Sequence, residues 1–436
     1  MYSPQIRTIF GAIAAFAVAP SLFAQETSAP AAAGATEGGS AWLIMAVAAI
    51  MVMFVGLVAR ELGFSHSRNS VNVIMKALLT LSIAIIAYLF VGFGLMYVSP
   101  NPDGLLSQVS DVEGPFWSFF LVQAMIVAVA AFICSGATGE RFRFGGYLFV
   151  IAIFSGLAFP MIAQFVWGSQ AQAFGVNSAA GWLETAGFHD FSGGIVIHLM
   201  GGAFALAGAL ALGPRAGRFA NDGSPRLVAG HSVPLAAAGV FLLWIGWLGL
   251  AIGQVYIRGI DPDAIGRIAV NLCVGAGFAS VIAVGVTWGL RSRPDATATL
   301  NGALTGLVAV SAAADILTPA IAAAVGACAS LLMLGVAAML EKAGVDDVVN
   351  AGPVHLVGGI VSALAVAAVN PSLITIQAIG ALVIAGITFA LGFVVFKALD
   401  LSLGVRASDE EQATGLDFSQ HAAAAYPESF ESNDAS

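Results

Sequence analysis

Two histidines occupy matching places in two copies of a short pattern, and both copies lie in long apolar stretches. Each copy has an aspartate, a histidine eight residues later and a glycine pair that begins three residues after the histidine. The copies consist of Asp190, His198, Gly201 and Gly202, and of Asp347, His355, Gly358 and Gly359. A histidine buried in hydrocarbon is costly, and a matched pair in two halves of a chain indicates a shared site made by an internal repeat.

Two neighbouring imidazoles could do several kinds of chemistry. A neutral imidazole offers one donor and one acceptor, so a pair can share a proton, line a file of small polar molecules or hold a metal ion. A metal is the weakest of these readings, because no Cys, Asp or Glu is expected at the same depth to complete the ligand set. The remaining alternative is a pair of packing histidines, each hydrogen-bonded to a neighbouring helix.

The composition predicts a polytopic membrane protein, because 59% of the residues are hydrophobic, 9% are charged and the mean hydropathy is +0.92. The net charge of -9 comes partly from an acidic tail and says little about partners. Neither Lys76, Lys342 nor Lys397 follows a glycine in a phosphate-binding loop, which argues against ATP-driven pumping. We expect no enzyme activity, no cofactor, no metal and no nucleic acid partner; the expected surroundings are a lipid bilayer.

Apolar segments of about 20 residues, long enough to cross a bilayer, predict an all-α fold with eleven transmembrane helices. The segments are 41–59, 77–98, 116–138, 145–167, 191–212, 233–254, 268–289, 300–317, 319–340, 353–369 and 374–398. The division between the eighth and the ninth rests on Thr318 and Pro319.

The N-terminus has the features of a signal peptide over residues 1–24, with an uncleaved first helix as the alternative. A periplasmic spacer over 25–40, a transmembrane domain over 41–400 and a cytoplasmic tail over 401–436 follow. Of the 16 lysines and arginines, Arg7 lies in the signal peptide, two lie outside and all others lie on the cytoplasmic side. The two outside are Arg258 and Arg267. This bias predicts an N-out, C-in orientation.

With four segments between them, the fifth and tenth helices run in opposite directions, so the fold is expected to be an inverted 5+5 repeat plus a final helix. Eight residues of helix rise about 12 Å, which places each histidine that far inward from its aspartate. This depth is near the middle of a hydrocarbon core about 30 Å thick. The two opposed helices would therefore bring both imidazoles to the midplane.

Several separate stretches resemble the ammonium transporter family, also called the ammonium transporter and Rhesus family, over nearly the whole mature chain. They are ELGFSHSRNSVN from Glu61, GERFRF from Gly139, DFSGGIVIHLMGG around His198, HSVPLAAAGVFLLWIGWLG from His231, PVHLVGGIV around His355 and the tail EEQATGLDFSQHAAAAY. The resemblance implies a homotrimer of eleven-span subunits, each with one pore for ammonium or methylammonium. It also implies that His198 and His355 line this pore.

By the same resemblance, Asp190 supports an outer recruitment site, and Trp167 lies over that site, where its ring face can attract ammonium. The structural alternatives are an N-terminal cap for Asp190 and an interfacial anchor for Trp167.

The chain departs from the family pattern at three entrance positions. Ile126 and Leu250 stand where gating phenylalanines are usual, and Gln254 stands where a serine is usual. An aliphatic gate leaves recruitment to Trp167 and the Gln254 carbonyl, so we expect altered affinity or selectivity. If the register shifts by one helical turn, the gate residues come from Phe116, Phe119, Phe120 and Trp247.

The chemical problem is to separate ammonium from potassium, which has the same charge and a similar size. Moving a bare ion into an apolar lumen costs on the order of 20 kcal/mol, so a dry pore rejects both ions, but ammonium can shed a proton. The sequence thus predicts recruitment of ammonium, its deprotonation and passage of ammonia past the twin histidines, across the cytoplasmic (inner) membrane. Transport could be neutral or electrogenic.

Two alternatives stay open. One is an ammonium sensor that signals through its tail. The resemblance implies docking of a PII-type regulatory protein at the cytoplasmic face. Ala423, however, replaces an acidic residue that is common at this position of the family's tail. Only 36 residues follow Asp400, too few for a fused output domain, which favours transport. The other alternative is a passive gas channel closer to the Rhesus branch.

Overall fold

The computed structural model describes residues 37–97 and 114–426. The predicted signal peptide over 1–24 lies outside the described residues, as do positions 25–36 of the predicted spacer. Residues 37–40 already belong to the first helix. The described part of the chain consists of helices, turns and isolated β-bridges and contains no β-strand.

The long helical segments lie where the apolar stretches of the sequence predict them. In the first half they are α2 (Glu37–Phe64), the segment Ser67–Tyr97 around α3 (Ser70–Ala87), α6 (Phe116–Thr138), the segment Phe144–Trp167 and the segment Gly194–Leu212. In the second half they are α11 (Val233–Ile257), α12 (Ile265–Arg291), α13 (Ala296–Ser311), α14 (Pro319–Lys342), the segment Gly352–Val369 and α16 (Ile374–Leu403).

Ten of the helical segments in the described part are long and apolar enough to cross a membrane. α13, at the place of the predicted eighth span, has 16 residues and is shorter, so helix length supports ten spans and the eleventh stays a prediction. Large apolar side chains face outward along the helices; Phe241, Val281 and Leu382 are 64%, 65% and 70% exposed. Such an apolar exterior suits lipid and would make a soluble protein aggregate.

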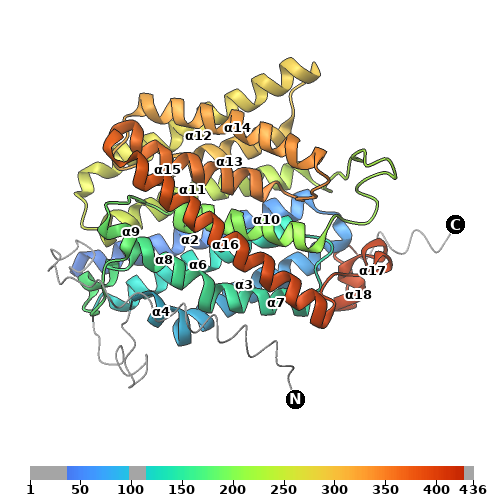
Figure 1. Cartoon of the computed structure of the whole chain (residues 1–436), viewed down its shortest axis with the longest axis horizontal. Coiled ribbons are helices and arrows are strands. Elements are labelled where there is room, and N and C mark those ends of the chain that lie inside the picture. Colours follow the sequence, from blue (N-terminus) through green and yellow to red (C-terminus); the bar gives the residue numbers. More distant parts are fainter. Residues whose placement is uncertain (1–36, 98–113, 427–436) are drawn as a thin grey trace.

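In Figure 1 the long helices lie side by side along the horizontal axis, and α16 crosses diagonally over them. The tail helices α17 (Asp409–Thr414) and α18 (Leu416–His421) lie at one end of this bundle. The carboxylate of Asp417 accepts a hydrogen bond from the backbone N–H of Asn72 (2.7 Å), at the start of α3, and Arg143 pairs with Glu411 at 2.8 Å. The tail is therefore part of the folded bundle at this end, which we call the inner end in keeping with the predicted orientation.

The turn between α17 and α18 offers a test of tail docking. Gly415 has a φ of 102°, and a Cβ there would lie 2.7 Å from the carbonyl oxygen of Arg68. Gly415→Ala combines backbone strain with a clash, so we expect it to release the tail and speed its removal by protease. Gly223→Ala is the matched control, because Gly223 has a φ of 81° but an added Cβ meets nothing within 4 Å. Equal cleavage rates in the two variants would contradict tail docking.

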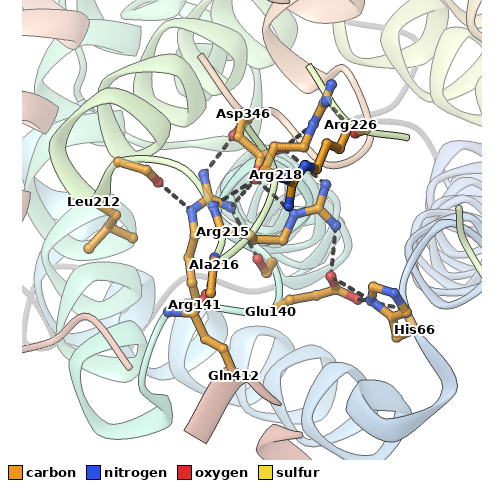
Figure 2. A network of polar contacts seen from close by, with 12 residues as sticks. His66, Glu140, Arg141, Leu212, Arg215, Ala216, Arg218, Arg226, Asp346 and Gln412 are labelled. Atoms are coloured by element: carbon orange, nitrogen blue, oxygen red, sulfur yellow. Dashed lines mark hydrogen bonds and ion pairs between the residues drawn. The ribbon is translucent and has the colours of Figure 1, made fainter. Parts of the chain in front are cut away.

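Figure 2 shows charged side chains that meet at the inner end from loops far apart in the sequence. We call this set the inner ion cluster; it consists of Glu140, Arg141, Arg215, Arg218 and Asp346. Arg215 pairs with Glu140 at 2.7 Å and with Asp346 at 2.8 Å, and Arg218 approaches Asp346 at 3.4 Å. Asp346 directly precedes the second copy of the histidine pattern, so the inner ion cluster fixes the start of the segment that carries His355.

Candidate functional site

The two copies of the histidine pattern fold in the same way. His198 lies in the π-helical segment η7 (Gly194–Leu199) and His355 in the π-helical segment η9 (Gly352–Val357). These continue as α10 (Met200–Leu212) and α15 (Gly358–Val369). Three residues after each aspartate the backbone is left-handed, with φ of 86° at Gly193 and 57° at Asn350. π-helical turns are rare and are frequent at functional sites, so the shared geometry supports a paired site.

Both aspartates of the pattern cap the segments that follow them. The carboxylate of Asp190 accepts hydrogen bonds at 2.8 to 3.1 Å from three backbone N–H groups, those of Gly193, Ile195 and Val196. The carboxylate of Asp347 accepts two, at 2.9 and 2.6 Å, from Ala351 and Gly352. Burial raises the pKa of both carboxyls, and these backbone donors act against that shift. The capping role considered for Asp190 thus holds, and it orients the helix end that carries His198.

The glycine pairs let the two copies cross closely. A Cβ on Gly202 would collide with the backbone of His355 and Leu356, and one on Gly359 would lie 2.7 Å from the Cβ of Leu199. The pairings run in opposite directions along the two segments, so the segments cross antiparallel. The second glycine of each pair is therefore needed for the same reason. Gly202 leaves room for Leu356, next to His355, and Gly359 leaves room for Leu199, next to His198.

The crossing stacks three aromatic rings at the centre of the bundle. The His198 and His355 ring centroids are 5.2 Å apart, with an angle of 18° between the ring planes. Trp247 also stacks on His198, with ring centroids 4.5 Å apart and an angle of 17° between the planes. The Trp247 indole N–H donates to Ser311 Oγ at 2.8 Å, which fixes the outer ring of the stack. All three rings are buried.

The surroundings of the imidazole nitrogens bear on the alternatives that the sequence left open. Within the described part of the chain, none of the four ring nitrogens of His198 and His355 has a hydrogen-bond partner, although both side chains are buried. Packing histidines tied to neighbouring helices do not fit this arrangement, since buried polar groups are normally paired. Nor do the described residues include a group of three His, Cys, Asp or Glu placed to hold a metal. The four ring nitrogens are therefore available to hydrogen-bond a small polar molecule.

A cavity adjoins the ring stack toward the inner end. It is lined by His355, by Arg60 and Glu61 of α2, by Val349 and by residues of α6, and its volume is about 10 Å³. This is room for about one water molecule. Among the described residues Arg60 Nε has no hydrogen-bond partner, whereas Nη2 donates to the Asn301 side-chain oxygen at 2.8 Å. The space beside His355 is thus small and partly polar.

The predicted recruitment residues lie together near the end opposite the tail. The Trp167 indole N–H donates to the carbonyl oxygen of Asp190 at 2.9 Å, and Gln254 is buried with its Nε2 free of protein partners in the described residues. The predicted gate residues Ile126 and Leu250 are both buried in the core.

Trp247 is a site residue that the sequence offered only as one of the residues of a shifted gate. It stacks on His198, whereas Phe119 stacks on Phe174 with centroids 4.4 Å apart. Leu250 follows Trp247 by three residues, which puts the two on the same face of α11 and the predicted gate within one helical turn of the stack.

Arg258 is the site residue that the sequence missed. Its guanidinium carbon lies 5.8 Å from the centre of the Trp167 ring, and its Nε donates to the Gln254 side-chain oxygen at 3.4 Å. Its Nη2 donates to the carbonyl oxygen of Asp190 at 2.5 Å. From the sequence, Arg258 was interpreted only as one of two positive charges on the outside. Its spacing of four residues from Gln254 was the signal that could have indicated a contact between the two side chains.

Comparison with known proteins agrees with this geometry. The family model described as Ammonium Transporter Family matches residues 41–426. The chain is 34% identical over 420 residues to ammonium transporter Amt2 of Archaeoglobus fulgidus, covering 88% of this chain and 87% of the relative. It is 33% identical over 400 residues to ammonium transporter Amt1 of Methanocaldococcus jannaschii, covering 89% and 96%. A solved structure described as a sensor Amt protein superposes with a TM-score of 0.82 at 31% identity, covering 87% of this chain and 97% of that chain. The chain belongs to the Ammonium Transporter Family.

Proposed function

We propose that this multi-pass membrane transporter recruits ammonium near Trp167, removes its proton and conducts ammonia past His198 and His355. Ammonium transport itself follows from family membership, and proteins of this family are transporters and channels, not enzymes. The observation that carries the route is the buried stack of two imidazoles whose four nitrogens have no partner among the described residues.

The physical argument rests on charge. An ion in this buried, apolar region would have to give up its hydration at a cost of several kcal/mol or more, whereas ammonia is neutral. A neutral imidazole can accept a hydrogen bond from an ammonia N–H and donate one to the ammonia lone pair. Potassium has no proton to lose, so the same region excludes it.

The wider architecture is part of the same proposal. The chain would span the cytoplasmic (inner) membrane eleven times as an inverted 5+5 repeat plus a final helix, with the N-terminus outside and the tail inside. It would assemble as a homotrimer and present the tail to a PII-type regulatory protein. The antiparallel crossing of the two histidine segments supports the inverted repeat, and the distribution of lysine and arginine supports the orientation.

The proposal is tested by recording both uptake and current in proteoliposomes under an inward gradient of ammonium, methylammonium or potassium. We expect saturable uptake of ammonium and methylammonium and none of potassium. A current with ammonium would identify electrogenic transport, and uptake without current would identify neutral transport. Potassium flux at the ammonium rate would contradict the proposed separation by deprotonation.

A second candidate is an ammonium sensor, favoured by the likeness to the sensor Amt protein and by the docked tail. A sensor would bind ammonium and change the protease sensitivity of the tail while moving little substrate across the proteoliposome membrane. A Rhesus-like passive gas channel would give unsaturated uptake that does not respond to membrane potential.

A further inference from the structure

Arg258 contacts all three residues predicted to recruit ammonium. It lies over the Trp167 ring at 5.8 Å, donates to the Gln254 side-chain oxygen at 3.4 Å and donates to the Asp190 carbonyl oxygen at 2.5 Å. A further bond from Nε reaches the Phe191 carbonyl oxygen at 3.0 Å. The guanidinium is thus held in one place by four groups from three separate parts of the chain.

These contacts are of the kind that a bound ammonium ion would make. An aromatic face attracts a cation through the negative potential above the ring, and carbonyl oxygens accept its N–H groups. The indole N–H of Trp167 is already bonded to Asp190, which fixes the ring in the orientation that Arg258 meets. The side-chain oxygen of Gln254 also accepts from Gln170 Nε2 at 3.4 Å. The outer site therefore already contains a cation that belongs to the protein.

We propose that Arg258 is a tethered cation that competes with ammonium for the indole face and the Gln254 oxygen, and so sets a low affinity at the outer site. This inference rests on the proposed recruitment of ammonium at that site. Two unit charges about 6 Å apart repel by an amount that corresponds to between about threefold and a hundredfold in affinity, depending on the effective dielectric constant. An effect of about tenfold on ammonium affinity is expected.

The experiment compares the wild type with Arg258→Gln, Arg258→Met and Arg258→Lys. Glutamine keeps an N–H donor for the Asp190 and Phe191 carbonyls without the charge, methionine removes both, and lysine keeps the charge. The matched control is Arg267→Gln, because Arg267 is also predicted to lie outside and donates instead to the Leu317 carbonyl at 3.1 Å.

Two readouts are taken on each full-length variant: the KM and maximal rate of methylammonium uptake in proteoliposomes, and ammonium binding by calorimetry in detergent. We expect Arg258→Gln to lower KM and the dissociation constant about tenfold, while Arg258→Lys and Arg267→Gln stay within about twofold of the wild type. A purely structural role would instead lower the maximal rate in the glutamine and lysine variants alike and leave KM unchanged.

The outcomes separate this inference from the proposed function. An unchanged or weakened ammonium affinity in Arg258→Gln, with the protein folded by size-exclusion chromatography, would overturn the role of Arg258. Wild-type protein that binds ammonium but does not transport it would overturn the transport route and leave the binding comparison intact. If Arg258→Met does not fold, the glutamine and lysine variants still decide the question.

Discussion

Replacing His198 or His355 with alanine is expected to reduce ammonium uptake into proteoliposomes by about a hundredfold. The reason is that the two imidazoles carry unpaired polar atoms in the buried ring stack, and a positioned proton-transfer group contributes about 10² to 10⁴ in rate. His198→Ala also removes the ring that stacks on both Trp247 and His355, and His355→Ala removes the ring that stacks on His198.

The control for this experiment is His231→Ala. His231 lies at the inner end, where its Nδ1 bonds with the Ser65 carbonyl oxygen at 2.9 Å, away from the ring stack. We expect this variant to transport at close to the wild-type rate. Wild-type rates in both single variants, His198→Ala and His355→Ala, would refute the assigned role of the pair. A loss of rate in His231→Ala of the same size would show that the assay reports general damage.

The helix positions could be predicted where an apolar run ends at a residue with capping chemistry. The predicted third segment, 116–138, coincides with α6 (Phe116–Thr138). The division at Thr318 and Pro319 is confirmed, because α13 ends at Ser311 and α14 begins at Pro319. The Thr318 side chain accepts from the Ile321 N–H at 3.4 Å, and proline is well tolerated in the first turn. The helix at the predicted first span, α2, includes residues from Glu37 and not only from 41, because it extends into small and polar residues that an apolar window leaves out.

The central pair could be anticipated because it repeats. Matching spacing after an aspartate predicts equal depth, and the rings indeed lie 5.2 Å apart, but their part in transport stays a prediction. The spacing does not predict that both segments are π-helical, since that depends on how the backbone adapts to the close crossing at Gly202 and Gly359.

The contacts of Arg258 and the folded tail could not be predicted from the sequence. The approach of Arg258 to Trp167 depends on how α11 is rotated against the helix that ends at Trp167, which local spacing does not determine. The tail contacts join Asp417 to Asn72, two residues separated by most of the chain. The pattern of the tail indicates more than a solvated end, but it does not identify the helix that the tail contacts.

The largest effect on stability is expected at the inner ion cluster. The Asp346 carboxylate accepts two hydrogen bonds from the Arg215 side chain, at 2.8 and 2.9 Å. It accepts a third from the Arg215 backbone N–H at 3.0 Å. It also lies near Arg141 and Arg218, at 4.0 and 3.4 Å. Asp346→Asn keeps the shape but removes the negative charge that Arg141, Arg215 and Arg218 share. Breaking a buried ion pair in this way costs about 3–5 kcal/mol, so we expect a markedly lower melting temperature in detergent.

The matched control is Glu341→Ala. Glu341 pairs with Arg218 at 2.5 Å but its side chain is 46% exposed, so its removal is expected to change stability by less than about 1 kcal/mol. Equal melting temperatures for wild type and Asp346→Asn at neutral pH would show that the cluster is not a source of stability.

The dependence on pH gives an independent check on Asp346. Burial alone would raise the pKa of its carboxyl, but the hydrogen bonds from Arg215 and the charge of Arg141 outweigh it and lower the pKa from 3.8 to about 2. Because the folded pKa lies below the unfolded one, the unfolded chain takes up the proton first as the pH falls. The stabilisation is therefore complete above about pH 4 and is lost as the pH falls through about 2. The difference in melting temperature between wild type and Asp346→Asn should stay constant from pH 8 to 5 and shrink below pH 4, whereas a difference due to packing alone would persist at every pH.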